Sequence, residues 1–90
     1  MTNLAKIQRE VEAAIAAATW VSTPAPRDAE AYEGKAPGAV FTVVAFSIED
    51  QGFPPGSRGY DGAVAFSRGL LVRLTREQAE RAVQQARASI

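Results

Sequence analysis

The chain has neither cysteine nor histidine among its 90 residues. Without cysteine it forms no disulfide, no thiolate nucleophile and no thiolate metal site. Without histidine it has no Ser-His triad, no histidine general base and no His-ligated zinc or iron site. These two absences exclude many catalytic and metal-binding chemistries, and we predict that the protein uses no cofactor.

Long apolar runs are also lacking. No stretch approaches the ~20 apolar residues that a membrane-spanning helix requires. The alanine-rich stretch at 13–21 follows Glu10 and Glu12 directly and has few large aliphatic residues, which is unlike a secretory signal peptide. We therefore expect a cytoplasmic protein with no membrane partner.

Charge of one sign does not dominate, since ten basic residues balance ten acidic residues. The acidic residues outnumber the basic ones in residues 1–50, and arginines outnumber acidic residues in 51–90. This pattern indicates a mild dipole and a solvated surface rather than a strongly basic face. The alanine- and arginine-rich usage suggests a GC-rich bacterium or its phage.

Ninety residues form one domain, covering 1–90, with a modest core. The first predicted element is a helix over 3–19, with Asn3 as its N-cap. Its apolar residues recur at helical spacing and form one stripe. They are Leu4, Ile7, Val11, Ile15 and Ala18.

The segment 20–38 gives weaker signals. Residues 19–23 either end the first helix or form a short extended piece. Pro24 and Pro26 interrupt regular structure, and Pro26 favours a single helical turn over Arg27–Glu33 that Gly34 ends.

The strongest strand signal is the β-branched and aromatic run at 39–48. Residues 63–75 form either one long strand or a hairpin with a three-residue turn at 67–69. Gly69 stands where such a turn needs a positive φ. We favour the hairpin, because a strand over all of 63–75 would be long against the usual ~5–6 residues.

A second helix follows this strand region. Thr75 and Gln78 have the spacing of a capping box at its start. Its apolar stripe is thin and rich in alanine, which predicts close packing against the sheet or the first helix. The stripe consists of Ala79, Ala82, Val83, Ala86 and Ile90.

These elements predict an α+β fold of order α-β-β-β-α. A small antiparallel three-stranded meander carries the N-terminal and the C-terminal helix on one face. We expect Phe41, Val43 and Leu71 on the other face, which two helices cannot easily cover. This uncovered face predicts a homodimer or another partner, unless 20–38 folds over it.

The segment 49–62 is the most unusual stretch of the chain. Pro54 and Pro55 stiffen it, and Asp61-Gly62 is a second turn signal. If it is an exposed recognition loop, it presents Phe53, Arg58 and Tyr60, which are residue types enriched at protein interfaces. The alternative is that Phe53 and Tyr60 pack back against the end of the sheet.

Two further aromatic residues lie outside the confidently predicted elements. We include Trp20 and Tyr32 among the predicted partner-binding residues. The alternative for Trp20 is core packing at the end of the first helix.

Catalysis would have to rely on the carboxylates of Glu49, Asp50 and Asp61, because histidine and cysteine are absent. Their spacing matches no calcium-binding loop. We therefore expect no enzyme and no metal site.

The predicted function is a small non-enzymatic protein-interaction module, such as an adaptor, a regulator or an inhibitor of a larger protein. It is expected to form a homodimer. The alternative is a nucleic-acid-binding protein of modest affinity that uses the arginines of residues 58–87, although zero net charge argues against strong phosphate binding.

Overall fold

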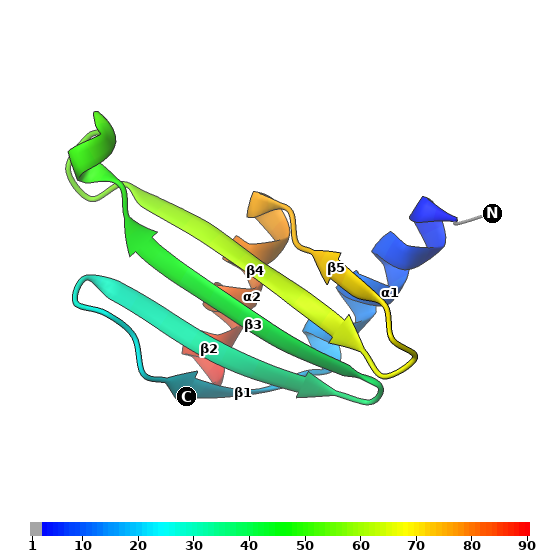
Figure 1. The fold of residues 1–90 in the computed structure, drawn as a ribbon. Coiled ribbons are helices and arrows are strands. Elements are labelled where there is room, and N and C mark those ends of the chain that lie inside the picture. The colour runs from blue at the N-terminus through cyan, green and yellow to red at the C-terminus, as the bar shows by residue number, and fades with distance from the viewer. Residues whose placement is uncertain (1–2) are drawn as a thin grey trace.

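The computed structural model describes residues 3–90 and has two layers, one of helices and one of strands (Figure 1). The helices are α1 (Leu4–Ala17) and α2 (Arg76–Ser89), with a short 3-10 helix, η1 (Glu49–Gln51). The strands are β1 (Thr19–Thr23), β2 (Ala29–Ala36), β3 (Ala39–Ser47), β4 (Arg58–Phe66) and β5 (Leu71–Arg73). They form one antiparallel sheet in the order β1-β2-β3-β4-β5. The predicted α+β class is confirmed, but the three-stranded meander is wrong because the sheet has five strands.

Both helices lie on the same face of the sheet (Figure 1). The Asn3 side chain caps α1 by accepting a hydrogen bond from the Lys6 backbone N–H at 3.1 Å. At α2, Thr75 and Gln78 form the complete predicted capping box. No helix within residues 3–90 is long and apolar enough to cross a membrane.

The segment 20–38 differs most from its predicted structure. The helical turn predicted over Arg27–Glu33 is wrong, because β2 begins at Ala29. Alanine and glutamate are weak strand formers, but pairing with β3 along all of β2 overrides that preference. The segment therefore widens the sheet and does not cover the sheet face that is turned away from the helices.

The connection between β3 and β4 is shorter than the segment 49–62 suggested. β4 begins at Arg58, so Asp61 and Gly62 lie within a strand and the turn predicted there is wrong. The three-residue hairpin turn at 67–69 is confirmed. The Phe66 backbone N–H donates to the Leu70 carbonyl at 2.7 Å, and Gly69 has φ +97°.

The pairing register decides which residues of β3 face the helices. Phe41 pairs with Val64 and Val43 with Gly62, and both β3 side chains are fully buried under the helices. The expectation that Phe41 and Val43 lie on the face turned away from the helices is wrong, whereas Leu71 is exposed on that face. Both faces of β3 are apolar, so alternation alone did not identify the covered one.

The core lies between the sheet and the two helices. Trp20 of β1 is part of this core, with the centre of its ring 5.6 Å from that of Phe41. The same indole covers Gly34 in β2, where a Cβ atom would approach the ring to 2.5 Å. Gly34 is thus required because the indole occupies the place of its side chain.

We predict that Gly34→Ala lowers the free energy of unfolding by about 1–3 kcal/mol, because the new methyl group displaces Trp20. Urea denaturation measures this loss. The pair W20F/G34A is the matched test, since a smaller ring makes room for the methyl group. The double variant is expected to lose less stability than the two single losses together; additive losses would contradict the contact.

Candidate functional site

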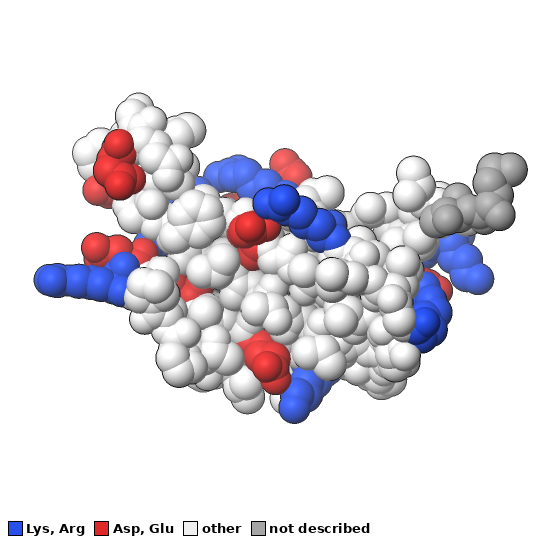
Figure 2. All heavy atoms as spheres, viewed as in Figure 1, with Lys and Arg blue, Asp and Glu red and all other residues white. Residues whose placement is uncertain are grey.

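The sheet face turned away from the helices is uncovered, and we call it the open face. Three of its large side chains are strongly exposed: Val21 at 52%, Val40 at 44% and Leu71 at 70%. Figure 2 looks onto this face and shows a largely uncharged centre with most charged groups toward its borders. An apolar face bordered by charge is typical of a protein-binding surface.

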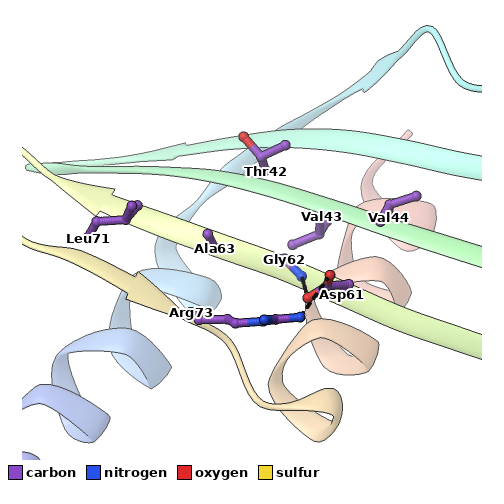
Figure 3. Close-up of a pocket in the computed structure, with 8 residues that line it drawn as sticks. All are labelled: Thr42, Val43, Val44, Asp61, Gly62, Ala63, Leu71 and Arg73. Atoms are coloured by element: carbon purple, nitrogen blue, oxygen red, sulfur yellow. Dashed lines mark hydrogen bonds and ion pairs between the residues drawn. The ribbon is translucent and has the colours of Figure 1, made fainter.

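A hollow of about 520 Å³ lies on the open face along β4 (Figure 3). It forms because Ala63 and Ala65 point outward from β4 between larger residues of its neighbours. Val44 of β3 stands on one side, and Leu71 and Arg73 of β5 stand on the other. The face is therefore not flat but has a ridge along β3 beside a groove along β4.

Two weak ion pairs lie on the open face. Arg73 donates to the Asp61 carboxylate at 3.4 Å. Lys35 lies 3.7 Å from the Glu33 carboxylate. Such exposed pairs contribute little to stability, so these charged groups are free to change partners when another surface approaches.

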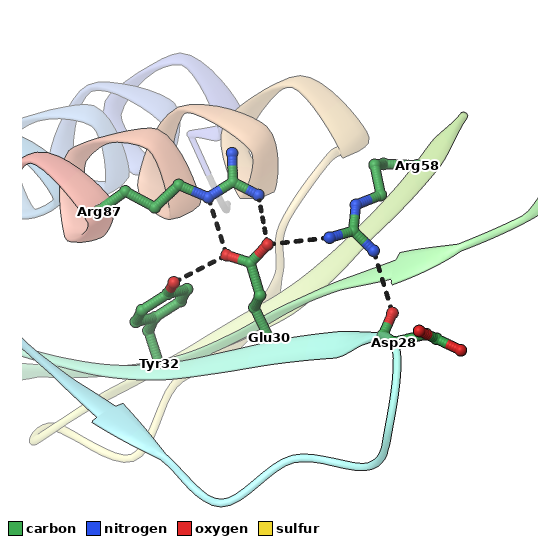
Figure 4. Close-up of polar contacts among 5 residues, drawn as sticks. All are labelled: Asp28, Glu30, Tyr32, Arg58 and Arg87. Atoms are coloured by element: carbon green, nitrogen blue, oxygen red, sulfur yellow. Dashed lines mark hydrogen bonds and ion pairs between the residues drawn. The ribbon is translucent and has the colours of Figure 1, made fainter. Parts of the chain in front are cut away.

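A different polar cluster lies on the helix side of the sheet, around the Glu30 carboxylate (Figure 4). Arg87 of α2 binds it in a bidentate manner, with N···O distances of 2.8 and 2.7 Å. Arg58 donates to the same carboxylate at 3.0 Å, and the Tyr32 hydroxyl donates to it at 2.8 Å. Hydrogen bonding from Arg87 is the main reason that the pKa of Glu30 falls from 4.5 to about 2.

This cluster joins three elements of the fold. Glu30 is in β2, Arg58 is in β4 and Arg87 is in the last turn of α2. The hydrogen bond from the Tyr32 hydroxyl to the Glu30 carboxylate raises the pKa of Tyr32, because the carboxylate holds the hydroxyl proton. We infer a structural role for the cluster, since each charged group already has a partner within the chain.

The five residues predicted to bind a partner do not form one surface. Tyr32 and Arg58 meet at Glu30, and Tyr60 lies half-buried with the Arg76 guanidinium 5.6 Å from its ring centre. Trp20 is only 4% exposed and packs in the core, which was its alternative. Whether any of them binds a partner stays a prediction.

Phe53 is the member of this set that is most exposed, at 51%, between η1 and β4. Its loop is held by hydrogen bonds at both ends. The Gly56 backbone N–H donates to the Glu49 carboxylate, and the Ile48 N–H donates to the Ser57 carbonyl at 3.2 Å. The braced loop thus leaves about half of Phe53 exposed.

The sequence missed the residues that shape the open face, including Val21, Ala63 and Arg73. The alternation in residues 63–66 and the glycine at position 69 placed Leu71 correctly. Nothing in the sequence showed that β1 and β2 extend the same face.

The three acidic residues considered for catalysis do not converge. Asp61 pairs with Val44 within the sheet, whereas Glu49 and Asp50 lie in η1 beyond the end of β3. Glu49 is five positions after Val44, roughly 16 Å along an extended chain. Among residues 3–90, no group of three or more acidic side chains is placed to hold a metal ion.

No protein-family model matches the chain. No curated protein and no solved structure is significantly similar to it either. A function for this chain is therefore inferred from its own surface and chemistry.

The lowered pKa of Glu30 predicts an acid-sensitive stability. The carboxylate is more acidic in the folded chain, so the cluster stabilises the fold above about pH 4.5 and loses this effect as pH falls toward about 2. Glu30→Gln is expected to cost about 1–2 kcal/mol near pH 7, allowing for partial solvent screening, and much less near pH 2. Urea denaturation at both pH values measures the difference, with Asp50→Asn, an exposed carboxylate, as the control. An equal loss at both pH values would argue against the ion pair as its source.

The loop and the Glu30 cluster are expected to respond differently to truncation. Phe53→Ala removes an exposed side chain and is predicted to change the free energy of unfolding by less than about 0.5 kcal/mol. Arg58→Ala leaves part of the Glu30 charge unpaired and is predicted to cost about 1–2 kcal/mol. Thermal unfolding compares the two. A large loss for Phe53→Ala would mean that the aromatic ring supports the fold.

Proposed function

We propose that this chain is a small, non-enzymatic protein-interaction module, and that the open face is its main contact surface. The observation that carries this proposal is the set of exposed apolar side chains on the open face, from β1 to β5. Val21 of β1, Val40 of β3 and Leu71 of β5 are strongly exposed on it. Burying such a face against another protein removes apolar surface from water, which is the principal driving force of association.

Phe53 provides a second, smaller contact in this proposal. It projects from the end of the molecule on a braced loop, so it loses little freedom on binding. An adaptor, a regulator or an inhibitor could use such a tip to reach a larger protein while the open face makes the wider contact.

The alternative, nucleic-acid binding through the arginines of 58–87, has less support. Five of these six arginines pair with acidic side chains in the chain: Arg58, Arg68, Arg73, Arg81 and Arg87. The Arg76 guanidinium donates to the Arg58 carbonyl at 3.1 Å. Arginines that are already paired with carboxylates contribute less to phosphate binding and to its salt dependence.

Leu71→Glu tests the proposed surface. The substitution places a charge within the apolar contact, so it is expected to reduce partner capture from a lysate of the native host at least tenfold. Leu4→Glu is the matched control, because Leu4 is a leucine of similar exposure, 71%, on α1 instead. Quantitative mass spectrometry of the captured proteins compares both variants with the original chain.

Equal capture by all three proteins would contradict the open face as the binding surface. Binding of short DNA or RNA duplexes, measured by fluorescence anisotropy at low and moderate salt, separates the alternative function. Salt-sensitive binding there, without captured protein, would favour nucleic acid.

A further inference from the structure

We propose that the partner on the open face is a second copy of this chain, in a two-fold symmetric dimer. This inference rests on the proposed function, because it names the occupant of the surface described there. The shape and charge of the open face are complementary to those of a second, rotated copy of the same face.

The sheet register arranges the open face in rows across the strands. The central row contains an acidic residue in β2 and a basic residue in β5, three strands apart. In order from β2 to β5 it consists of Glu33, Thr42, Ala63 and Arg73. The next row has the same pattern of sizes, with Lys35, Val40, Ala65 and Leu71.

Consider a two-fold axis that runs parallel to the strands, midway between β3 and β4. It places each row opposite the same row of the second copy, with the order of the strands reversed. The β3 ridge of one copy then faces the β4 groove of the other, so that Thr42 opposes Ala63 and Val40 opposes Ala65. The hollow beside Ala63 is the space that receives the opposing side chains (Figure 3). Interdigitation of this kind is how aligned sheets pack.

The same axis brings opposite charges together. β2 of one copy faces β5 of the other, and Glu33 then opposes Arg73 in the central row. Sheets pack about 10 Å apart, a gap that a glutamate and an arginine from opposite sides bridge together. Because the contact is isologous, this ion pair occurs twice in the dimer.

The perpendicular arrangement has the opposite electrostatic effect. A two-fold axis that crosses the strands at the central row would set Glu33 against its own copy and Arg73 against its own copy. Like charges placed opposite one another disfavour association. At this row, charge therefore favours the axis along the strands.

The contact area is consistent with a reversible dimer. Three strands of about eight residues and the three-residue β5, about 4.8 Å apart, outline roughly 440 Å² on each copy, or roughly 900 Å² for the pair. This is near the lower limit for a specific interface, so we expect dissociation in the micromolar range.

Charge exchange tests both the dimer and its geometry. Sedimentation velocity and light scattering of the full chain from about 1 to about 300 µM follow the change in mass with concentration. The original chain is expected to approach twice its 9.6 kDa mass. Glu33→Arg and Arg73→Glu alone are each expected to raise the dissociation constant at least tenfold, because each creates two like-charge contacts.

The double variant E33R/R73E is expected to restore the dissociation constant to within about threefold of the original, since the two pairs form again with reversed signs. Within one chain these positions lie three strands apart, roughly 14 Å, so the rescue reports a contact between copies. Arg9→Glu, on the exposed surface of α1, is the control for a change of charge elsewhere. Thermal unfolding of each variant verifies that it is folded.

Two outcomes would overturn this proposal. A folded chain that stays monomeric throughout the concentration range has no second copy on its open face. A dimer that neither single variant weakens, or that the double variant fails to restore, uses another geometry. The proposed function has its own readout, because loss of heterologous capture by Leu71→Glu with a monomeric chain would retain the open face as a binding surface for a different protein.

Discussion

The pairing of β3 with β4 is the constraint on which the rest of this structure depends. Its register places Phe41 and Val43 under the helices and leaves Val40 and Thr42 outside. A slip of one residue would exchange these sets, because strand side chains alternate between faces. Gly62 contributes to the fit, since a Cβ atom there would come within 2.7 Å of the Thr42 carbonyl oxygen and the Val43 side chain. The buried core and the open face are therefore two results of one register.

The polar contacts on the two sides of the sheet have different roles. On the helix side, Glu30 connects β2, β4 and α2 through Arg58 and Arg87. At the other end of α2, Gln78 is buried and donates from its amide to the Glu12 carboxylate at 3.1 Å, which joins α2 to α1. On the open face the ion pairs are exposed and weak. Polar groups thus fix the helices to the sheet, whereas the opposite face stays available for association.

Small side chains shape both faces of the sheet. Gly34 makes room for the Trp20 ring on the covered face, and Gly59 lies against the Phe46 side chain on the open face. The outward alanines of β4 leave the groove beside β3. A domain of this size has a modest core, so association through the open face would also add stability in proportion to chain concentration.

The sequence by itself determined the absence of cysteine and histidine chemistry, the two helices with their caps and the strand at 39–48. It favoured the hairpin turn before Leu71 over one long strand. These features depend on residue type or on neighbours within a few positions. Only the tertiary structure decided that 29–36 is a strand, that Phe41 is covered and that Arg58 and Tyr32 share one carboxylate. Those outcomes depend on pairing between residues far apart in the chain, and both faces of β3 are apolar enough to serve as the core. The open face became recognisable only when five strands had a common register.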